Sequence, residues 1–312
     1  MISNFRQLYN PKKESPHREY SKSMSSNVSH LKMSNCKVIK SKGFTLIEFI
    51  VAMVILGILA VGISSFVQFG SRMYADVSAR DQILSSARFA IERLNRELRG
   101  ALPNSARITT NECLEFMPII SSTVYVDIPV SPDDASDEIT IVPTTASKDI
   151  VDTINESGYS DDPFNAMVYP TSPDDVYLES NNKFYPIVSA TYSTNEATIP
   201  HSLFLNNAEL FAEDSTTSRV YFVDESVMYC IEANDDDYRL IRYDVASHTA
   251  AGTPVTDVDD GVVMADFLTE ESVFSTESAN LQRNSIVSIR LNFKRQYEEI
   301  VFENEVQVPN VP

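Results

Sequence analysis

The chain has 312 residues, enough for one large or two small domains, and carries 25 Lys and Arg against 44 Asp and Glu, a formal charge of −19. This acidic balance excludes nucleic acid as a partner, because proteins hold a phosphate backbone with clustered Lys and Arg. The hydrophobic fraction of 43% is typical of a folded protein. The 3 Cys and 4 His are too few and too scattered for a conventional zinc module.

The charge is distributed unevenly along the chain. Residues 1–43 contain nine basic and two acidic residues, which leaves 16 basic and 42 acidic residues in 44–312. The basic segment is followed by 23 residues without a charge, from Phe49 to Ser71. A helix of that length rises about 34 Å, enough to cross the hydrocarbon core of a bilayer. The basic flank predicts a cytoplasmic N-terminus and an exported, periplasmic remainder.

A cleaved secretory signal is the alternative to a retained membrane helix. Such a signal has a shorter apolar region, of about 7–15 residues, followed by a small-residue cleavage site. The apolar run is longer here and a helical pattern follows it, which favours the retained helix. Glu48 lies at the head of the run, and a carboxylate placed in a bilayer is a functional candidate. The alternative is that Glu48 lies hydrated at the interface.

The run Lys42-Gly43-Phe44-Thr45-Leu46-Ile47-Glu48, with the apolar stretch behind it, resembles the class III signal of type IV prepilins and type II secretion pseudopilins. The resemblance implies that a prepilin peptidase removes the basic leader 1–43 between Gly43 and Phe44, and methylates the new amino group of Phe44. It also implies that Glu48 meets the N-terminal amine of a neighbouring subunit, which offsets its burial. The leader is long for this class, and Met1, Met24 and Met33 all remain possible starts.

The helical pattern continues beyond the apolar stretch. Apolar residues form one face, at Met73, Val77, Leu84, Ala87, Ile91, Leu94 and Leu98. The other face carries Arg72, Arg88, Arg93, Arg96 and Arg99, with Glu92 and Glu97 between them. Gly100 and Pro103 predict its end. We expect one helix over 44–99, with a transmembrane half (44–71) and an amphipathic periplasmic half that ends by residue 100. Its Arg-rich face is either simply solvated or attracts acidic surfaces of neighbouring subunits.

Beyond residue 103 the apolar pattern changes to a period of two. Strands are predicted at 112–118, 123–128, 138–142, 184–192, 219–224, 226–232, 238–244, 261–268, 285–294 and 300–308. The pairs 226–232/238–244 and 285–294/300–308 read as hairpins. A helix followed by strands, without βαβ alternation, predicts an α+β fold in which the long helix packs on an antiparallel sheet of a mainly β domain, 101–312. The polar segment 145–183 is expected to be a long loop or insertion.

The amphipathic half refines the resemblance. The stretches 61–66, 78–82, 86–94, 96–99 and 102–105 resemble MSHA (mannose-sensitive haemagglutinin) pilus biogenesis proteins of the MshO type, relatives of the J-class minor pseudopilins, and the ending 303–312 fits that group. Ser65 stands where major type IV pilins usually carry a kinking Pro, which favours a minor subunit. The resemblance implies an inner-membrane protein that contacts other pilins through its N-terminal helix and enters an extracellular pilus. It further implies a pilus assembly platform protein and a cytoplasmic ATPase.

No enzymatic or cofactor site is expected. Only His201 and His248 lie beyond the leader, and neither a Gly-x-Ser-x-Gly motif nor a phosphate-binding glycine loop is present. Calcium binding at Asp235-Asp236-Asp237 stays open, although such runs usually mark solvated hairpin turns. Cys113 and Cys230 are the cysteines outside the leader, and an oxidising periplasm would allow them to form a disulfide. The alternative is two buried free thiols.

Two classes of function follow. In the first, the chain is a minor pilin, a structural subunit that initiates or caps a filament. In the second, the C-terminal domain is a tip-displayed adhesin or ligand-binding module, with loops of 145–215 as its surface. A minor pseudopilin of type II secretion is a further alternative to the first.

Overall fold

The computed structural model describes residues 43–109, 112–156, 164–192, 201–235, 237–245, 261–277, 284–296 and 298–308. Two units can be distinguished, Met1–Val61 and Gly62–Pro312. The elements run in the order α1 (Leu46–Arg99), β1 (Arg107–Ile108), β2 (Leu114–Phe116), β3 (Ser121–Asp127), β4 (Ser136–Ile141), α2 (Thr145–Glu156), β5 (Asn165–Val168), α3 (Pro173–Tyr177), η1 (Glu179–Asn181), β6 (Phe184–Thr191), β7 (His201–Glu209), β8 (Arg219–Val223), β9 (Ser226–Asn234), β10 (Asp237–Val245), β11 (Val262–Leu268), β12 (Val273–Glu277), β13 (Ser285–Arg295) and β14 (Glu298–Val308).

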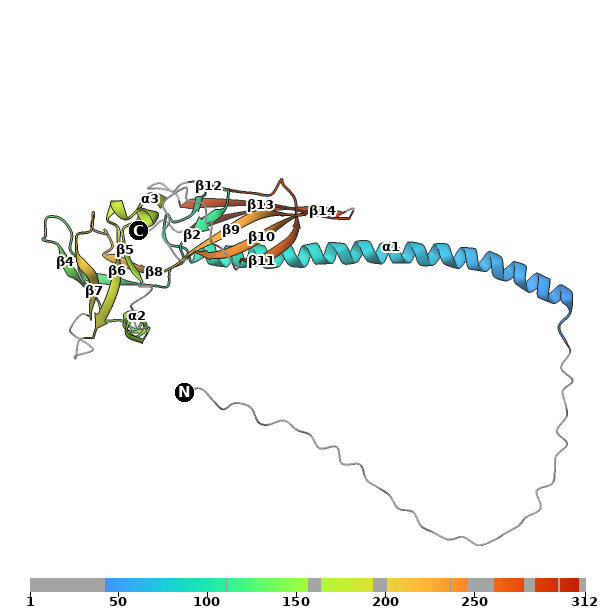
Figure 1. Cartoon of the computed structure of the whole chain (residues 1–312), viewed down its shortest axis with the longest axis horizontal. Coiled ribbons are helices and arrows are strands. Elements are labelled where there is room, and N and C mark those ends of the chain that lie inside the picture. The colour runs from blue at the N-terminus through green and yellow to red at the C-terminus, as the bar shows by residue number, and fades with distance from the viewer. Residues whose placement is uncertain are drawn as a thin grey trace, which may run out of the picture. The chain divides into compact units, whose positions relative to one another are not determined.

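The predicted α+β class is confirmed: a single helix of 54 residues, α1, packs against antiparallel strands. Seven strands of an eight-stranded sheet have the order β1-β2-β9-β10-β11-β13-β12. The eighth strand, β14, also pairs with β13 and lies outside this linear order. Figure 1 shows the last part of α1 running along β9, β10, β11 and β13. Both predicted hairpins are present, β9–β10 and β13–β14. Asp235 begins the turn of the first with a φ of 49°, a left-handed conformation that Asp tolerates better than most residues.

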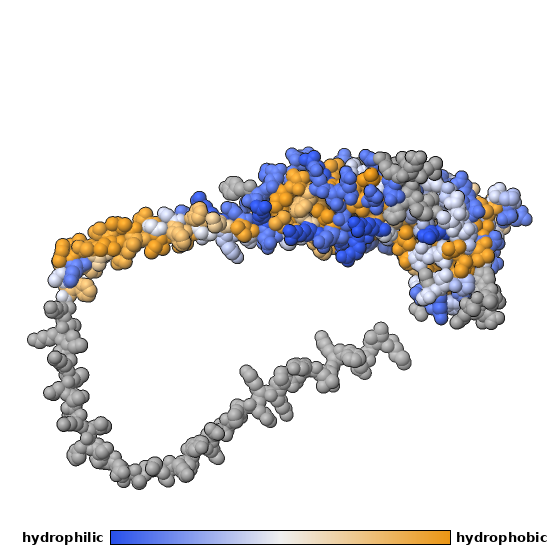
Figure 2. Space-filling view, turned by 180° about the vertical axis from the view of Figure 1, so that it is seen from behind, coloured by the Kyte–Doolittle hydropathy of each residue, from blue (hydrophilic) through white to orange (hydrophobic). Residues whose placement is uncertain are grey.

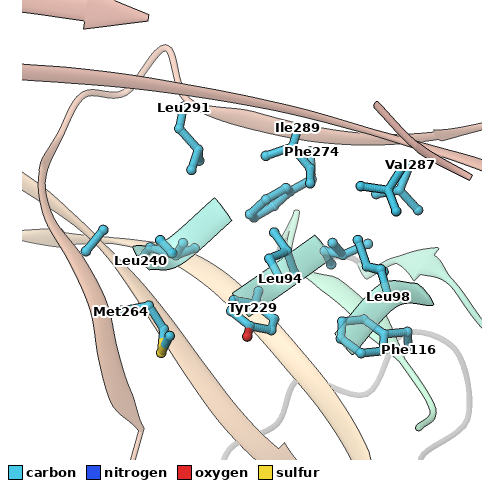
Figure 3. Packing of buried hydrophobic residues seen from close by; sticks show 14 of the residues in the cluster. Leu94, Leu98, Phe116, Tyr229, Leu240, Met264, Phe274, Val287, Ile289 and Leu291 are labelled. Atoms are coloured by element: carbon cyan, nitrogen blue, oxygen red, sulfur yellow. The ribbon is translucent and has the colours of Figure 1, made fainter. Parts of the chain in front are cut away.

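The main hydrophobic core lies between α1 and this sheet. Figure 3 shows Leu94 and Leu98 among side chains of β2, β9, β10, β11, β12 and β13. The fully buried positions of α1 are Ala79, Ile83, Ala87, Ala90, Leu94 and Leu98. The start of the predicted apolar face does not belong to this core, because Met73 and Val77 are 55% and 63% exposed. The burial of α1 begins only at Ala79, and it includes Ile83 rather than Leu84.

A second sheet closes into a six-stranded barrel, in the order β3-β4-β7-β6-β5-β8. The run β8-β5-β6-β7 is a Greek key, because three consecutive strands are joined by a fourth that returns beside the first. The barrel has its own core, to which α2 contributes Ile150, Val151 and Ile154. Of the two alternatives expected for 145–183, a long loop or an insertion, the loop is wrong, because the described part contains α2, β5, α3 and η1.

The barrel is inserted in the chain between two strands of the eight-stranded sheet. It is formed by residues 121–223, and β2 and β9, the strands on either side of it in sequence, are hydrogen-bonded neighbours in the eight-stranded sheet. The mainly β region 101–312 is therefore a helix-packed sheet with a barrel inserted between two adjacent strands.

Candidate functional site: the prepilin-type N-terminus and its support

The residues of the cleavage site that the family resemblance implies lie just before α1. Gly43, Phe44 and Thr45 are outside the helix, which begins at Leu46. The side chain of Phe44 is 88% exposed, and a Cβ added to Gly43 would meet no atom within 4 Å. The peptide bond between Gly43 and Phe44 is thus accessible and lies in a non-helical segment. A protease binds such a segment without first unwinding a helix.

Thr45 and Glu48 form a reciprocal cap at the start of α1. The backbone N–H and the hydroxyl of Thr45 donate to Oε2 of Glu48, at 2.9 and 3.0 Å. The backbone N–H of Glu48 points back to the hydroxyl of Thr45, at 3.4 Å. A Thr followed three residues later by Glu is the sequence pattern of a capping box, which satisfies helix donors that have no partner within the helix. The carboxylate of Glu48 therefore fixes where α1 begins.

The first half of α1 presents apolar side chains on its whole surface. Figure 2 shows this part of the helix covered by hydrophobic residues. Their side chains are between 48% and 78% exposed from Leu46 to Phe69. Within the described part of the chain, α1 is the helix that is long and apolar enough to span a membrane. A helix that is hydrophobic all round requires either lipid or other apolar helices as its surroundings.

The second half of α1 is held to the sheet by a polar cluster around Glu97. Its carboxylate accepts hydrogen bonds from the hydroxyl of Tyr229 at 2.8 Å and from Nε of Arg242 at 3.1 Å. Nε of Arg93, one turn earlier, donates to the same group at 2.9 Å. Burial raises the pKa of Tyr229, and the adjacent Glu97 charge raises it further. Burial disfavours the charge of Arg242, but its bonds to Asp244 and Glu97 outweigh this and raise its pKa.

This cluster divides the Arg-rich face predicted from the sequence. Arg93 and Glu97 are partly buried and belong to the helix–sheet contact, a role that the sequence did not indicate. The remaining members of that face are exposed, namely Arg72, Arg88, Arg96, Arg99 and Glu92. The sequence carries only a weak signal for the role of Glu97 in this contact, because its partners Tyr229 and Arg242 lie more than a hundred residues away.

Cys113 and Cys230 are joined by a disulfide in the structure, with Cα atoms 4.4 Å apart. Cys113 immediately precedes β2 and Cys230 lies in β9, one register step beyond the pair Leu114 and Tyr229. Both cysteines are buried, beside Met228, Tyr243 and Val245. The bridge therefore connects the two strands between which the barrel is inserted.

A buried joint connects the barrel to the sheet. Leu102 and Met117 pack with barrel residues, among them Val176 and Tyr221. The hydroxyl of Tyr177 donates to the carbonyl oxygen of Ser105 at 3.0 Å. Burial, and then the charge of Glu115, raises the pKa of Tyr177. The sequence pattern did not indicate this joint, because it brings together residues far apart in the chain, from Leu102 to Tyr221.

Of the other candidate residues, the structure describes His201, Asp235 and Asp237. His201 is buried in the barrel, edge-on to the ring of Tyr192. His248 and Asp236 lie outside the described residues. Over the part of the chain that the structure describes, no three His, Cys, Asp or Glu side chains are placed to hold a metal ion.

The comparisons with known proteins agree with the geometry at the N-terminus. Residues 39–64 match the family model described as the prokaryotic N-terminal methylation motif. A search of curated proteins and a search of solved structures each gave no significant match. Proteins with this motif are typically structural subunits without enzymatic activity. The chain is therefore a type IV pilin- or pseudopilin-like protein, with a prepilin-type N-terminus that indicates processing by a prepilin peptidase.

Proposed function

We propose that the chain is the precursor of a minor pilin. A prepilin peptidase cleaves it between Gly43 and Phe44 and methylates the amino group of Phe44. The observation that carries this proposal is the match of the methylation motif to 39–64, at the place where the exposed, non-helical bond precedes the capped helix. Before assembly, α1 anchors the subunit in the inner membrane, with the N-terminus in the cytoplasm and residues beyond the apolar stretch in the periplasm.

In the filament, the first half of α1 packs against the same helix of other subunits. The small residues Ala52, Gly57, Ala60 and Gly62 allow a close approach, since a Cβ added to Gly57 or Gly62 would meet nothing within 4 Å. Glu48 turns from its own Thr45 toward the methylated amine of a neighbour. We assign the subunit to the initiation or tip of an MSHA-like pilus, as an MshO-type protein assembled by a platform protein and an ATPase. Type II secretion, with the chain as a minor pseudopilin, is the alternative system.

Intact-mass and N-terminal peptide spectrometry of the membrane-extracted protein tests the proposal. The expected mature chain begins at Phe44 and carries one additional methyl group. Gly43→Val is expected to leave the leader attached, because a branched side chain is placed at the cleaved bond. Gly70→Ala is the matched control, a glycine of α1 with equally open surroundings outside the motif. A wild-type chain that keeps residues before Gly43 would refute the proposal.

The inserted barrel supports a second function for the same subunit, the display of a binding module. A closed barrel with its own core is not needed to complete the helix-packed sheet, since β2 and β9 pair directly. We therefore propose that residues 121–223, rather than the loops of 145–215 alone, form the adhesin or ligand-binding part. A strain that lacks this protein separates the roles: loss of filaments indicates an assembly role, and loss of attachment with intact filaments indicates display.

A further inference from the structure

The barrel is connected to the rest of the chain through two strands of unequal strength. β2 has three residues, which pair with β9 at Leu114–Tyr229, Glu115–Met228 and Phe116–Val227. β9 has nine residues and is paired over its whole length with β10. An antiparallel ladder gains stability with each further pair, so β2 is the weaker attachment.

The weaker strand lies on the direct path from α1 to the barrel. The chain leaves α1 at Arg99, passes through β1 and β2, and enters the barrel at β3. A load that pulls the barrel away from α1 therefore acts first on β2. Its other neighbour, β1, has only two residues and adds little resistance.

We propose that the Cys113–Cys230 disulfide is a load-bearing clamp at the root of the inserted barrel. The bond joins the residue before β2 to a residue inside β9, so β2 cannot slide past β9 while the bond is intact. Load on β2 passes to the nine-residue ladder of β9 and β10 and from there to the core around α1. The biological use of the clamp depends on the proposed function, in which α1 is fixed in a filament and the barrel is exposed to a surface or ligand.

The surroundings of the bond fit a permanent covalent link. Cys113 and Cys230 are 5% and 4% exposed, covered by a cluster that includes Met228 and Tyr243. Reduction requires a thiolate to reach a sulfur atom, and this burial prevents such access. The contacts of the joint, among them the hydrogen bond from Tyr177 to Ser105 at 3.0 Å, are non-covalent and cannot replace the bond under load.

Magnetic-tweezer stretching of the full chain in a nanodisc tests the clamp. One handle is attached at the N-terminus and the other to a peptide tag inserted between Asn195 and Glu196. In both chains Cys36 is replaced by Ser, and the comparison is with the double variant Cys113→Ser, Cys230→Ser. Position 196 is 83 residues from Cys113 along the chain but 34 residues from Cys230. An extended residue spans about 3.5 Å. The end-to-end extension of the stretched double variant is therefore expected to exceed that of the disulfide-bonded chain by about 170 Å.

The force of the first unfolding event decides whether the bond bears load. We expect this force to be lower in the double variant, because β2 then separates from β9 before the rest of the sheet opens. Equal first-event forces would overturn the proposal even if the extensions differ, since the bond would then form without carrying load. Equal extensions would overturn it as well, because the bond would not have formed.

Two controls keep these outcomes distinct from misfolding and from the proposed function. Hydrogen exchange along β13 and β14 must be the same in both chains, which shows that the sheet is folded in the variant. The chain that carries Cys36→Ser alone, treated with reductant in mild denaturant and then returned to buffer, must behave as the double variant does. An unprocessed N-terminus would refute the filament role and leave the force result standing, whereas equal forces would refute the clamp and leave processing intact.

Discussion

The guanidinium of Arg107, in the sheet, lies 3.5 Å from the centroid of the Tyr177 ring, in the barrel. Arg107 also pairs with Glu115, whose other oxygen accepts a hydrogen bond from Ser226 at 2.8 Å. These residues come from both chain connections of the barrel, Arg107 and Glu115 before it and Ser226 after it. The barrel is therefore attached to the sheet by a specific buried contact and not only by two linkers.

The Tyr177 hydroxyl is expected to stabilise this joint. Tyr177→Phe keeps the ring under Arg107 but leaves the buried carbonyl of Ser105 without its donor, at a cost of about 1–2 kcal/mol. Hydrogen exchange should increase around residues 102–107 and 173–177. Tyr185→Phe is the control, since its hydroxyl binds Leu210 within the barrel region. Unchanged exchange at 102–107 in Tyr177→Phe would contradict the assigned role.

Changes in the capping box are expected to leave cleavage intact, and loss of its carboxylate is expected to impair assembly. Thr45→Val removes the hydroxyl that binds Glu48, and the start of α1 is expected to fray. Glu48→Leu removes the carboxylate that we propose meets the amine of a neighbouring subunit in the filament. We expect both variants to be cleaved after Gly43, and Glu48→Leu to enter filaments at least tenfold less well. Immunoblots of sheared filaments, with Glu92→Gln as the control carboxylate of the same helix, provide the measurement.

The Glu97 cluster is expected to hold α1 to the sheet. Glu97→Gln removes one of the two carboxylate charges that pair with Arg242, and unfolding should become easier by about 1–3 kcal/mol. Glu92→Gln, at an exposed position of α1, should change stability by less than about 0.5 kcal/mol. Urea unfolding of the detergent-extracted chain compares the two. Equal midpoints would show that the cluster does not stabilise the contact.

Alkaline pH is expected to destabilise the protein through its buried tyrosines. The pKa of Tyr229 is raised by burial and by Glu97, and that of Tyr243 by burial and by Glu232. Above about pH 10 the unfolded chain loses these protons while the folded chain keeps them, so stability falls as pH rises. Urea midpoints between pH 8 and 11 should decline, and less steeply in Tyr229→Phe. An identical slope in that variant would exclude Tyr229 as a contributor.

Gly261 is expected to tolerate no side chain. A Cβ at this position would lie 2.2 Å from Cε1 of Tyr243 and 2.5 Å from Cγ2 of Ile241. Gly261→Ala should therefore destabilise the sheet by about 1–3 kcal/mol through overpacking. Gly100→Ala is the matched control, because its added Cβ would meet nothing closer than 3.6 Å. Thermal unfolding followed by circular dichroism distinguishes the two, and equal midpoints would contradict the prediction.

The sequence predicted the elements whose pattern is local. The helix was expected at 44–99 and is present at Leu46–Arg99, because its uncharged stretch and its amphipathic period are both continuous. The hairpins β9–β10 and β13–β14 were predicted because their strands alternate and their connections are short. The cleavage motif was also readable, since Gly43, Phe44 and Glu48 lie within six residues.

Features that depend on distant pairing could not be predicted. β5 has four residues, and its pairing with β8 spans more than fifty positions, so the polar segment around it gave no strand pattern. The start of the buried face of α1 was misplaced because burial depends on where the sheet meets the helix, and helical period alone does not contain that information. Glu97 was assigned to an exposed face for the same reason.

The insertion of the barrel imposes an order on synthesis. Phe116 and Val227 are paired in the sheet, yet the whole barrel is made between them. β2 therefore has to remain without β9 until more than a hundred further residues have left the ribosome, and contacts this distant in sequence form slowly. The barrel, whose strands pair within 121–223, can fold during this interval. The sheet that packs on α1 is then the last part of the protein to become complete.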